Sequence, residues 1–208
     1  MTTPFPTDAT PLVLTSELVR LRPVTLADVP SIVAASAGDR SSYALTNVPH
    51  DEASARRYVE NLLAERSAGV SYAFAIEDLG HGEIVGMTRY LTIRWWFARE
   101  APDAVEIGGT WLAKRAQRTS VNTAAKTLLL TYAFEEWHVA RVDFKTDARN
   151  HQSRRALERL GASFEGVLQS WQPSGRADEL GRPRDSAMYA VVRERWPEVR
   201  ERLETLRH

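Results

Sequence analysis

Apolar residues recur along the chain with two periods, and each period predicts a different kind of element. Alternating apolar and polar positions are typical of strands with one buried face. They predict strands over residues 18–24, 72–77, 84–93, 105–112, 139–146, 164–171 and 186–192. Apolar residues that recur every three or four positions are typical of helices with one buried face. They predict helices that begin after Asp28 and after Asp51, and helices over residues 121–136, 153–160 and 196–206.

The order of these elements predicts a mixed α+β sheet flanked by helices. Gly80 and Gly82 lie between two predicted strands, where they favour a tight turn and an antiparallel hairpin. From residue 105 to residue 160 the order is strand, helix, strand, helix, which implies one right-handed parallel crossover. The Thr- and Pro-rich residues 1–15 are predicted to form a flexible arm, and residues 16–208 a single domain.

Composition removes several classes of function. Lys plus Arg and Asp plus Glu both number 27, so the whole chain carries no net charge to attract nucleic acid or an anionic membrane. It has no cysteine, and its five histidines show no metal-ligand spacing. No apolar run approaches the ~18 residues of a membrane span, and no signal sequence opens the chain. We therefore expect a cytoplasmic protein without metal, nucleic-acid or membrane partners.

One segment combines a strand end, basic residues and the start of the most regular predicted helix. Residues 112–123 carry Lys114, Arg115 and Arg118 just before that helix begins. The first N–H groups of a helix have no partner within it, and they lie at the positive end of its dipole, so this terminus suits an anion such as a pyrophosphate. The alternative is a solvated basic turn followed by a Ser- or Thr-capped helix.

Several short motifs occur in a specific order around these elements. They are Leu21-Arg22-Pro23 with Asp28, Val105-Glu106-Ile107-Gly108, Thr110-Trp111-Leu112, Gln117 through Asn122, Asn150-x-x-Ser153 before Leu160-Gly161, Arg184-Asp185-Ser186, Tyr189 and Trp196-Pro197. Through these motifs the chain resembles the GNAT superfamily of N-acetyltransferases, and within it the branch of RimJ/RimL-type ribosomal-protein N-terminal acetyltransferases. The resemblance covers nearly everything from Leu21 to Trp196.

The resemblance implies a strongly twisted, mostly antiparallel mixed sheet in which two central strands splay. The pantetheine arm of acetyl-CoA would lie in the gap between the strands over residues 105–112 and 139–146, with the pyrophosphate on the loop after the first of them. It implies cofactor contacts at Ile107, Gly108, Thr110, Leu112, Gln117, Arg118, Thr119, Ser120, Val121, Asn122, Thr123, Asn150 and Ser153.

The pyrophosphate loop departs from the family pattern at two positions. Ser120 stands where the motif has glycine, and Arg118 stands where close relatives often have glycine. Serine can still offer its N–H if its φ is negative, whereas a glycine-only backbone angle would disfavour it. Affinity for CoA therefore depends on the backbone conformation of this loop, and Arg118 could compensate as a phosphate partner.

The reaction implied by the resemblance needs a base and a way for the thiolate to leave. We assign Glu106 as the base that takes the proton of the attacking amine, with a strand-holding ion pair to an arginine as the alternative. The resemblance gives Ser153 the role of assisting the thiolate and Asn150 a CoA contact, while a plain helix cap is the alternative for both. Residues 169–172, where the ribosomal-protein branch has a further carboxylate, contain none.

Aromatic residues form the remaining candidate site. Trp95, Trp96 and Trp171 are predicted to contact the acceptor or a second subunit, although core packing is the alternative.

The sequence thus predicts an N-acetyltransferase that moves an acetyl group from acetyl-CoA to a primary amine, either a protein N-terminus or a small molecule, by direct attack in a ternary complex. A homodimer is a further expectation. One alternative keeps the fold but uses succinyl-CoA or another acyl-CoA, with Arg94, Arg99 or Arg118 pairing the extra carboxylate. Another is a non-catalytic CoA-binding regulatory module, which the altered loop motivates.

Overall fold

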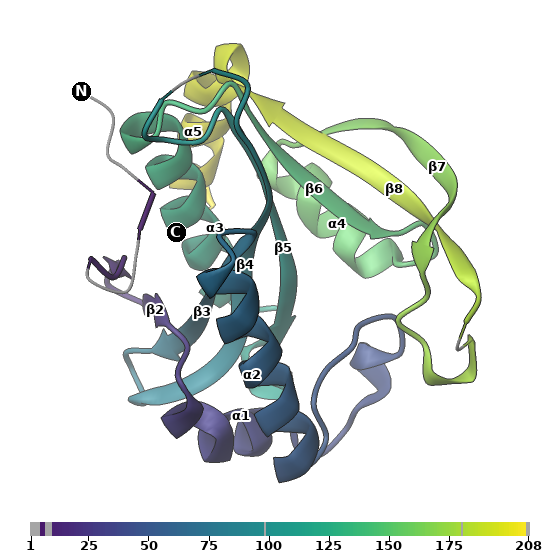
Figure 1. Ribbon diagram of the computed structural model, residues 1–208. Helices are drawn as coiled ribbons and strands as arrows, with labels where there is room; N and C mark the ends of the chain where they lie inside the picture. The colour runs from purple at the N-terminus through teal and green to yellow at the C-terminus, as the bar shows by residue number, and fades with distance from the viewer. Residues whose placement is uncertain (1–4, 7–9, 98, 180, 207–208) are drawn as a thin grey trace.

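The computed structural model describes residues 5–6, 10–97, 99–179 and 181–206, and within them one twisted sheet forms the centre of the protein (Figure 1). Its eight strands follow the order β1-β2-β3-β4-β5-β6-β8-β7. They span Leu14–Thr15 (β1), Val19–Pro23 (β2), Ser71–Asp78 (β3), Glu83–Arg94 (β4), Ala104–Leu112 (β5), Arg141–Asp147 (β6), Ser163–Pro173 (β7) and Pro183–Val192 (β8). Every neighbouring pair is antiparallel except β5 and β6, which are parallel. The predicted mixed, mostly antiparallel sheet is therefore confirmed.

Helices cover both faces of this sheet. They are α1 (Val29–Ser36), α2 (Glu52–Ser67), α3 (Val121–Thr131), α4 (His151–Leu160) and α5 (Trp196–Thr205). Helices α1 and α2 pack on β3 and β4 from one side. Helix α3 lies on the other side, where Tyr90 Oη of β4 donates a hydrogen bond of 2.6 Å to Leu129 O, and α5 packs beside it. Helix α4 continues this second layer over β6.

The predicted strands and helices are all present, with ends shifted by a few residues. The helix expected over residues 121–136 is α-helical only to Thr131 and continues as a π-turn over Tyr132–Glu136. Trp137, which follows the turn, is fully buried against Tyr90. Gly161 ends α4 in the left-handed conformation, with a φ of +99°, as expected for the residue just past a helix.

Parts of the leading segment pack on the domain. Leu14 and Thr15 pair with β2, and the N–H of Leu12 donates to Tyr72 Oη at 2.9 Å. The ring of Phe5 stacks on Trp137 at a centroid distance of 5.4 Å. The remainder of the predicted flexible arm, residues 1–4 and 7–9, lies outside the described residues.

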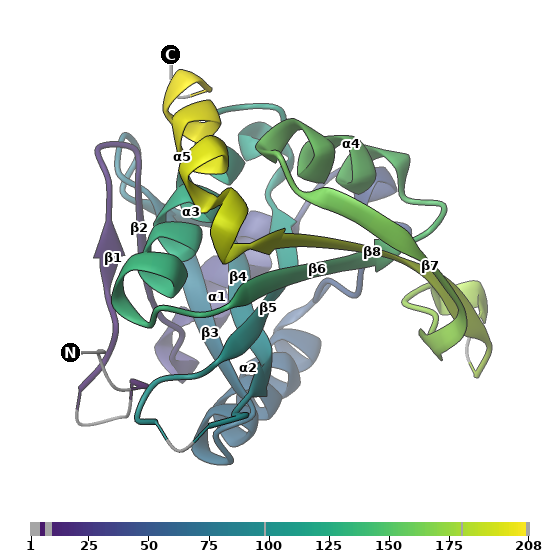
Figure 2. The ribbon, with the colours of Figure 1, turned by 90° about the horizontal axis from the view of Figure 1, so that it is seen from above.

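The contact between β5 and β6 divides the sheet into two halves. Only three residue pairs join these strands, from Ala104 with Arg141 to Glu106 with Asp143. Beyond Glu106, β5 pairs only with β4, and β6 pairs only with β8. Seen from above, β6, β8 and β7 with α4 extend away from the half that contains β2 to β5 (Figure 2). The expected splay between two central strands is therefore present.

Candidate active site

The gap between β5 and β6 has a closed end, which we call the vertex, and an open end. The vertex lies at Glu106, the last β5 residue paired with β6. The open end lies where β5 finishes at Leu112 and β6 at Asp147. Each strand then leads toward the amino terminus of a helix, α3 after β5 and α4 after β6. The carboxyl ends of parallel strands that separate in this way form the usual ligand crevice of an open α/β sheet.

Glu106 is buried at the vertex and is held by groups from both neighbouring strands. Its side chain lies on the face opposite Val105 and Ile107, as predicted. The Oε2 atom accepts hydrogen bonds from Thr92 Oγ1 at 3.0 Å and from Lys145 Nζ at 3.3 Å. Its side chain is 5% exposed, so this ion pair is largely shielded from water. The expected alternative partner is an arginine, whereas the structure places a lysine there.

Thr92 reaches Glu106 from an unusual backbone conformation. It lies where the pairing of β4 with β5 shifts register, between Leu91 and Arg94, and its φ is +49°. A β-branched residue at positive φ stores strain on the order of 1–3 kcal/mol, and such strain persists only where surrounding contacts enforce it. The bend turns the Thr92 hydroxyl onto Glu106, so backbone strain and carboxylate position are linked here.

More charges lie beside the vertex, and they are paired with one another. Arg94 forms an ion pair with Asp143 of β6, the residue opposite Glu106. Arg141 binds the same carboxylate at 2.6 Å and Glu165 of β7, also at 2.6 Å. Arg99 pairs with Asp103 at 2.8 Å. Arg94 and Arg99, two of the three arginines considered for a succinyl group, are therefore already neutralised by carboxylates.

At the open end, the loop from Ala113 to Ser120 is fastened to the last residue of β5. Gln117 Nε2 donates to Leu112 O and to Ser42 Oγ, both at 2.9 Å, so the Gln117 side chain braces the loop from inside. Tyr43 Oη donates to the same Leu112 oxygen at 2.8 Å. The loop is thus rigidly placed beside the gap.

The backbone angles of this loop show how Arg118 and Ser120 fit two positions where relatives have glycine. Ser120 precedes α3 with a φ of −70°, which serine adopts without strain. The left-handed position is instead Arg118, with a φ of +61°. The substitution at Ser120 therefore leaves its N–H available, and the conformational strain falls on Arg118.

The helix terminus has unused donors and one unpaired cation. Within the described chain, no hydrogen-bond partner takes the backbone N–H of Ser120, Asn122 or Thr123. Of the three basic residues expected to assist an anion, Lys114 pairs with Asp39 at 2.9 Å and Arg115 pairs with Glu83. The exposed Arg118 forms no ion pair with any described residue.

On the β6 side of the gap, Asn150 caps α4. Its Oδ1 accepts from the N–H of Ser153 at 3.0 Å, so the predicted alternative role of a helix cap is realised at Asn150. The Ser153 hydroxyl has no hydrogen bond to the described residues and remains available as a donor near the open end.

Lys126 lies beneath the middle of the gap and was not anticipated from the sequence. Its Nζ donates to Thr110 Oγ1 of β5 at 2.6 Å and to Thr88 Oγ1 of β4 at 3.2 Å. The ring of Phe144, on β6, lies 6.0 Å away. No carboxylate pairs with Lys126 among the described residues, and burial lowers its pKa to about 7. The sequence feature that could have revealed Lys126 is its place among the apolar positions of the helix predicted over residues 121–136.

The predicted aromatic site residues lie in two separate places. Trp95 and Trp96 follow the end of β4 near the vertex and are about half exposed. Trp171 lies on β7, one residue before Gln172, which pairs with Arg184 beyond the open end of β6. At roughly 3.3 Å per residue along β6, the two sets are separated by about the length of that strand. They do not form one aromatic group.

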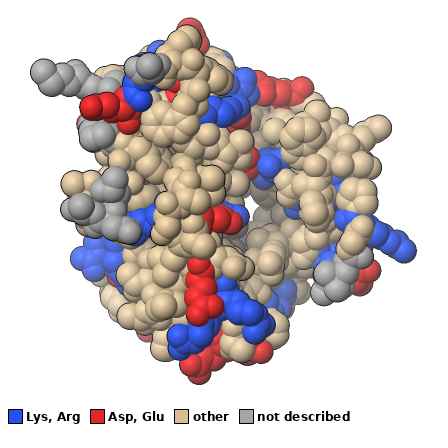
Figure 3. Space-filling model, viewed as in Figure 1, with Lys and Arg blue, Asp and Glu red and all other residues tan. Residues whose placement is uncertain are grey.

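The surface is deeply hollowed between the two halves of the molecule, and Lys and Arg atoms lie along the walls of the hollow (Figure 3).

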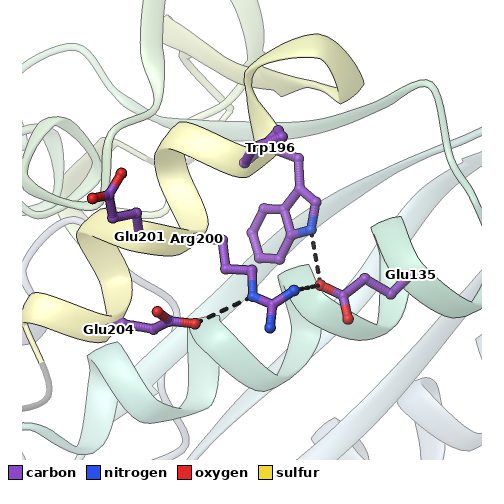
Figure 4. A pocket seen from close by; sticks show the side chains of 6 residues that line it. Glu135, Trp196, Arg200, Glu201 and Glu204 are labelled. Atoms are coloured by element: carbon purple, nitrogen blue, oxygen red, sulfur yellow. Dashed lines mark hydrogen bonds and ion pairs between the residues drawn. The ribbon is translucent and has the colours of Figure 1, made fainter.

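A separate pocket lies on the α5 side, lined by Glu135, Trp196, Pro197, Arg200, Glu201 and Glu204. There Trp196 Nε1 and Arg200 both donate to Glu135, at 3.0 and 3.1 Å (Figure 4). These hydrogen bonds join α5 to the π-turn, so the side chains of Glu135, Trp196 and Arg200 already have partners within the protein.

Comparison with known proteins agrees with this geometry. Residues 19–163 match the profile of the acetyltransferase (GNAT) domain, which includes β5, α3, β6 and α4. The chain belongs to the GNAT acetyltransferase family. The resemblance expected from the motifs is therefore confirmed.

Relatives of this GNAT protein include candidate ribosomal enzymes. YdaF of Bacillus subtilis (strain 168), described as a candidate ribosomal N-acetyltransferase, is 33% identical over 91 residues, which are 42% of this chain and 45% of YdaF. A candidate acetyltransferase from T. thermophilus is 34% identical, with a TM-score of 0.78 over 96% of this chain and 98% of that one. Mycobacterium smegmatis RimJ in complex with CoA-disulfide shares the fold, with a TM-score of 0.73, 24% identity and coverage of 94% and 92%.

The described part of this GNAT protein contains neither a membrane-spanning helix nor a cluster of metal-ligand side chains. Among the residues that the structure describes, no helix is long and apolar enough to cross a membrane. Within the same residues, no three His, Asp or Glu side chains come together as metal ligands.

Proposed function

We propose that the protein transfers an acetyl group from acetyl-CoA to a primary amine by direct attack in a ternary complex. The observation that carries the proposal is the gap that opens beyond Glu106 and ends at the unpaired N–H groups of the α3 terminus. A linear thioester with a pyrophosphate at one end has this shape. The chain holds a cation, Arg118, at the pyrophosphate end and a carboxylate, Glu106, at the other.

The chemistry needs one bond to form and one to break. The amine nitrogen attacks the thioester carbonyl carbon, the C–N bond forms, and the C–S bond breaks to release CoA. Along residues 107–112 the β5 backbone has no strand partner on the β6 side, so its N–H groups are available to stabilise the oxyanion. Gly109, with a φ of +56°, bulges the strand here, and a Cβ would meet Arg89 Nε at 2.6 Å.

Two protons must also move. Oε2 of Glu106 is occupied by Thr92 and Lys145, which leaves Oε1 to accept the amine proton, directly or through water. Oε1 lies toward Gly108, on the strand where the thioester would bind. The released thiolate takes a proton from water, which the free hydroxyl of Ser153 can relay by giving up its own proton and accepting one from water, and Glu106 returns the amine proton to solvent.

One acceptor class is a protein α-amino group, which is supported by the similarity to YdaF, a protein described as a candidate ribosomal N-acetyltransferase. Small-molecule amines remain the second class. The negative φ of Ser120 argues against the alternative of a non-catalytic module, because serine in this conformation keeps its N–H available to a pyrophosphate.

The test is calorimetric titration with acetyl-CoA, followed by thiol-release assays against an amine panel that includes peptides with free N-termini. We expect the wild type to bind acetyl-CoA and Glu106→Gln to bind it within about twofold, while kcat falls by about 10²–10³, as for loss of a general base. Absence of acetyl-CoA binding would contradict the proposal. An unchanged kcat in Glu106→Gln would remove Glu106 from the mechanism.

A further inference from the structure

Arg184 is a partly buried cation whose side chain pairs with no residue that the structure describes. It lies on β8, is partly exposed, and forms no hydrogen bond or ion pair through its side chain with any described residue. Its Nε is buried and unsatisfied. A buried donor without an acceptor is unfavourable, so such a group marks a place where a further partner completes the structure.

The neighbouring arginines show that pairing is the rule in this region. Arg94 and Arg141 bind Asp143, and Arg149 binds Asp147 at 2.8 Å and Glu179 at 2.7 Å. Arg184 lies among these pairs yet stays outside them. The exposed Arg182, two residues away, likewise forms no side-chain hydrogen bond or ion pair with a described residue, but its guanidinium is open to solvent, whereas the Nε of Arg184 is shielded.

The strand register places Arg184 on the Glu106 face of the open half of the sheet. Asp147 of β6 pairs with Ser186 of β8, and side chains two residues apart on a strand share a face. Arg184 therefore shares the face of Ser186, whose buried Oγ is also unsatisfied. Burial lowers the pKa of Arg184, and the nearby Arg149 acts in the same direction, while the carboxylates of Asp147 and Glu106 act in the opposite direction without ion-pair contact.

These surroundings distinguish between the anions that Arg184 could bind. A guanidinium is a planar fork that matches a carboxylate with two hydrogen bonds. A doubly charged phosphate would be repelled by the carboxylates of Asp147 and Glu106, and the pyrophosphate has its own terminus at α3 and Arg118. A singly charged carboxylate is the anion that this position suits.

We propose that Arg184 binds a carboxylate carried by one of the two substrates, on the Glu106 side of the gap. The inference rests on the proposed acyl transfer and extends it to a substrate class. The carboxylate belongs either to the acyl group, as in succinyl-CoA, or to the acceptor, as in an amino acid. Both sources offer the same chemistry to the guanidinium.

The experiment has one arm for each source. In the donor arm, wild type, Arg184→Gln and Arg182→Gln are titrated calorimetrically with acetyl-CoA and with succinyl-CoA. In the acceptor arm, each protein is saturated with CoA and titrated with phenylalanine and with phenethylamine, which differ in the carboxylate. Thermal melting of each variant verifies folding, and Arg184→Lys, which keeps the charge but loses the fork, provides a second variant.

We expect the carboxylate-bearing ligand of one arm to bind at least about tenfold more tightly than its partner in the wild type and in Arg182→Gln, as for a charge-assisted hydrogen bond. The preference should fall to within about twofold in Arg184→Gln and be intermediate in Arg184→Lys. The arm that shows the preference names the source.

No preference in either arm, or a preference that survives in Arg184→Gln, would overturn the assignment of Arg184 alone. Failure of the wild type to bind either CoA thioester would overturn the proposed function and this inference together. The two failures are therefore distinguishable.

Discussion

The two ends of the gap between β5 and β6 are built on opposite principles. At the vertex, Glu106 is buried and already bonded to Thr92 and Lys145. At the open end, backbone N–H groups at the start of α3 have no hydrogen-bond partner among the described residues. The stability of the vertex therefore depends on the balance of its buried charges, so removal of one charged side chain should destabilise it. Anion binding at the open end depends instead on backbone conformation. Between them lies Lys126, buried like the vertex but without a carboxylate.

The vertex should respond most strongly to removal of its cation. Replacement of Lys145 by Met leaves Glu106 buried without its ammonium partner, and we expect the free energy of unfolding to fall by about 3 kcal/mol. Chemical denaturation measures the change. Lys114→Met, which breaks the exposed pair with Asp39, is the matched control and should leave stability unchanged.

A double variant sharpens this test. Glu106→Gln combined with Lys145→Met removes both charges, and stability should recover to within about 1 kcal/mol of the wild type. If Lys145→Met alone is as stable as the wild type, the vertex is not a balanced charge pair and its contrast with the open end disappears.

Lys126 should make stability depend on pH in the middle of the gap. Its pKa is lowered to about 7 in the folded protein, so folding favours the neutral amine. The unfavourable contribution is fully present below pH 7 and shrinks as the pH rises toward the unfolded value. From pH 7 to pH 9 the wild type should gain about 2 kcal/mol of stability relative to Lys126→Met.

Urea unfolding of both proteins at the two pH values measures this difference. Lys114→Met should keep the pH dependence of the wild type, since Lys114 is exposed. Equal pH dependence in wild type and Lys126→Met would show that Lys126 stays charged in the fold.

The open end should show the smallest effect. Arg118→Gly relieves a left-handed backbone angle, and we expect it to stabilise the fold by about 0.5–1 kcal/mol while weakening acetyl-CoA binding through loss of the cation. Ser120→Gly should give no such stabilisation, because Ser120 already has a negative φ. If Ser120→Gly stabilises the fold instead, the backbone strain lies at Ser120 and not at Arg118, which would contradict this assignment.

The sequence predicted those features that depend on local pattern. Strand alternation and helical periodicity predicted these elements correctly, because an element with one buried face shows a regular apolar pattern among residues that are close in sequence. Glu106 was predicted at the splayed strand for the same reason, together with the family motif. The cap formed by Asn150 followed from its place just before α4.

Features that depend on distant partners were not predicted. Lys145 lies 39 residues from Glu106, and only the parallel pairing of β5 with β6 brings them together. The positive φ of Arg118 belongs to a loop that the Gln117 side chain ties back to Leu112, a contact that local pattern does not reveal. The exclusion of Arg184 from the surrounding ion pairs is a property of the assembled face.

The three residue pairs that join β5 to β6 also set how the molecule deforms. Past Glu106 no backbone hydrogen bond links the described residues of the two half-sheets, so spreading them breaks none, and we expect the gap to widen and narrow about the vertex as a hinge. An extended ligand with amide groups could lie between β5 and β6 as a further strand would, and its hydrogen bonds to both strands would join the two half-sheets. Amide hydrogen exchange along β5 should therefore slow on the side that faces the gap when the ligand binds.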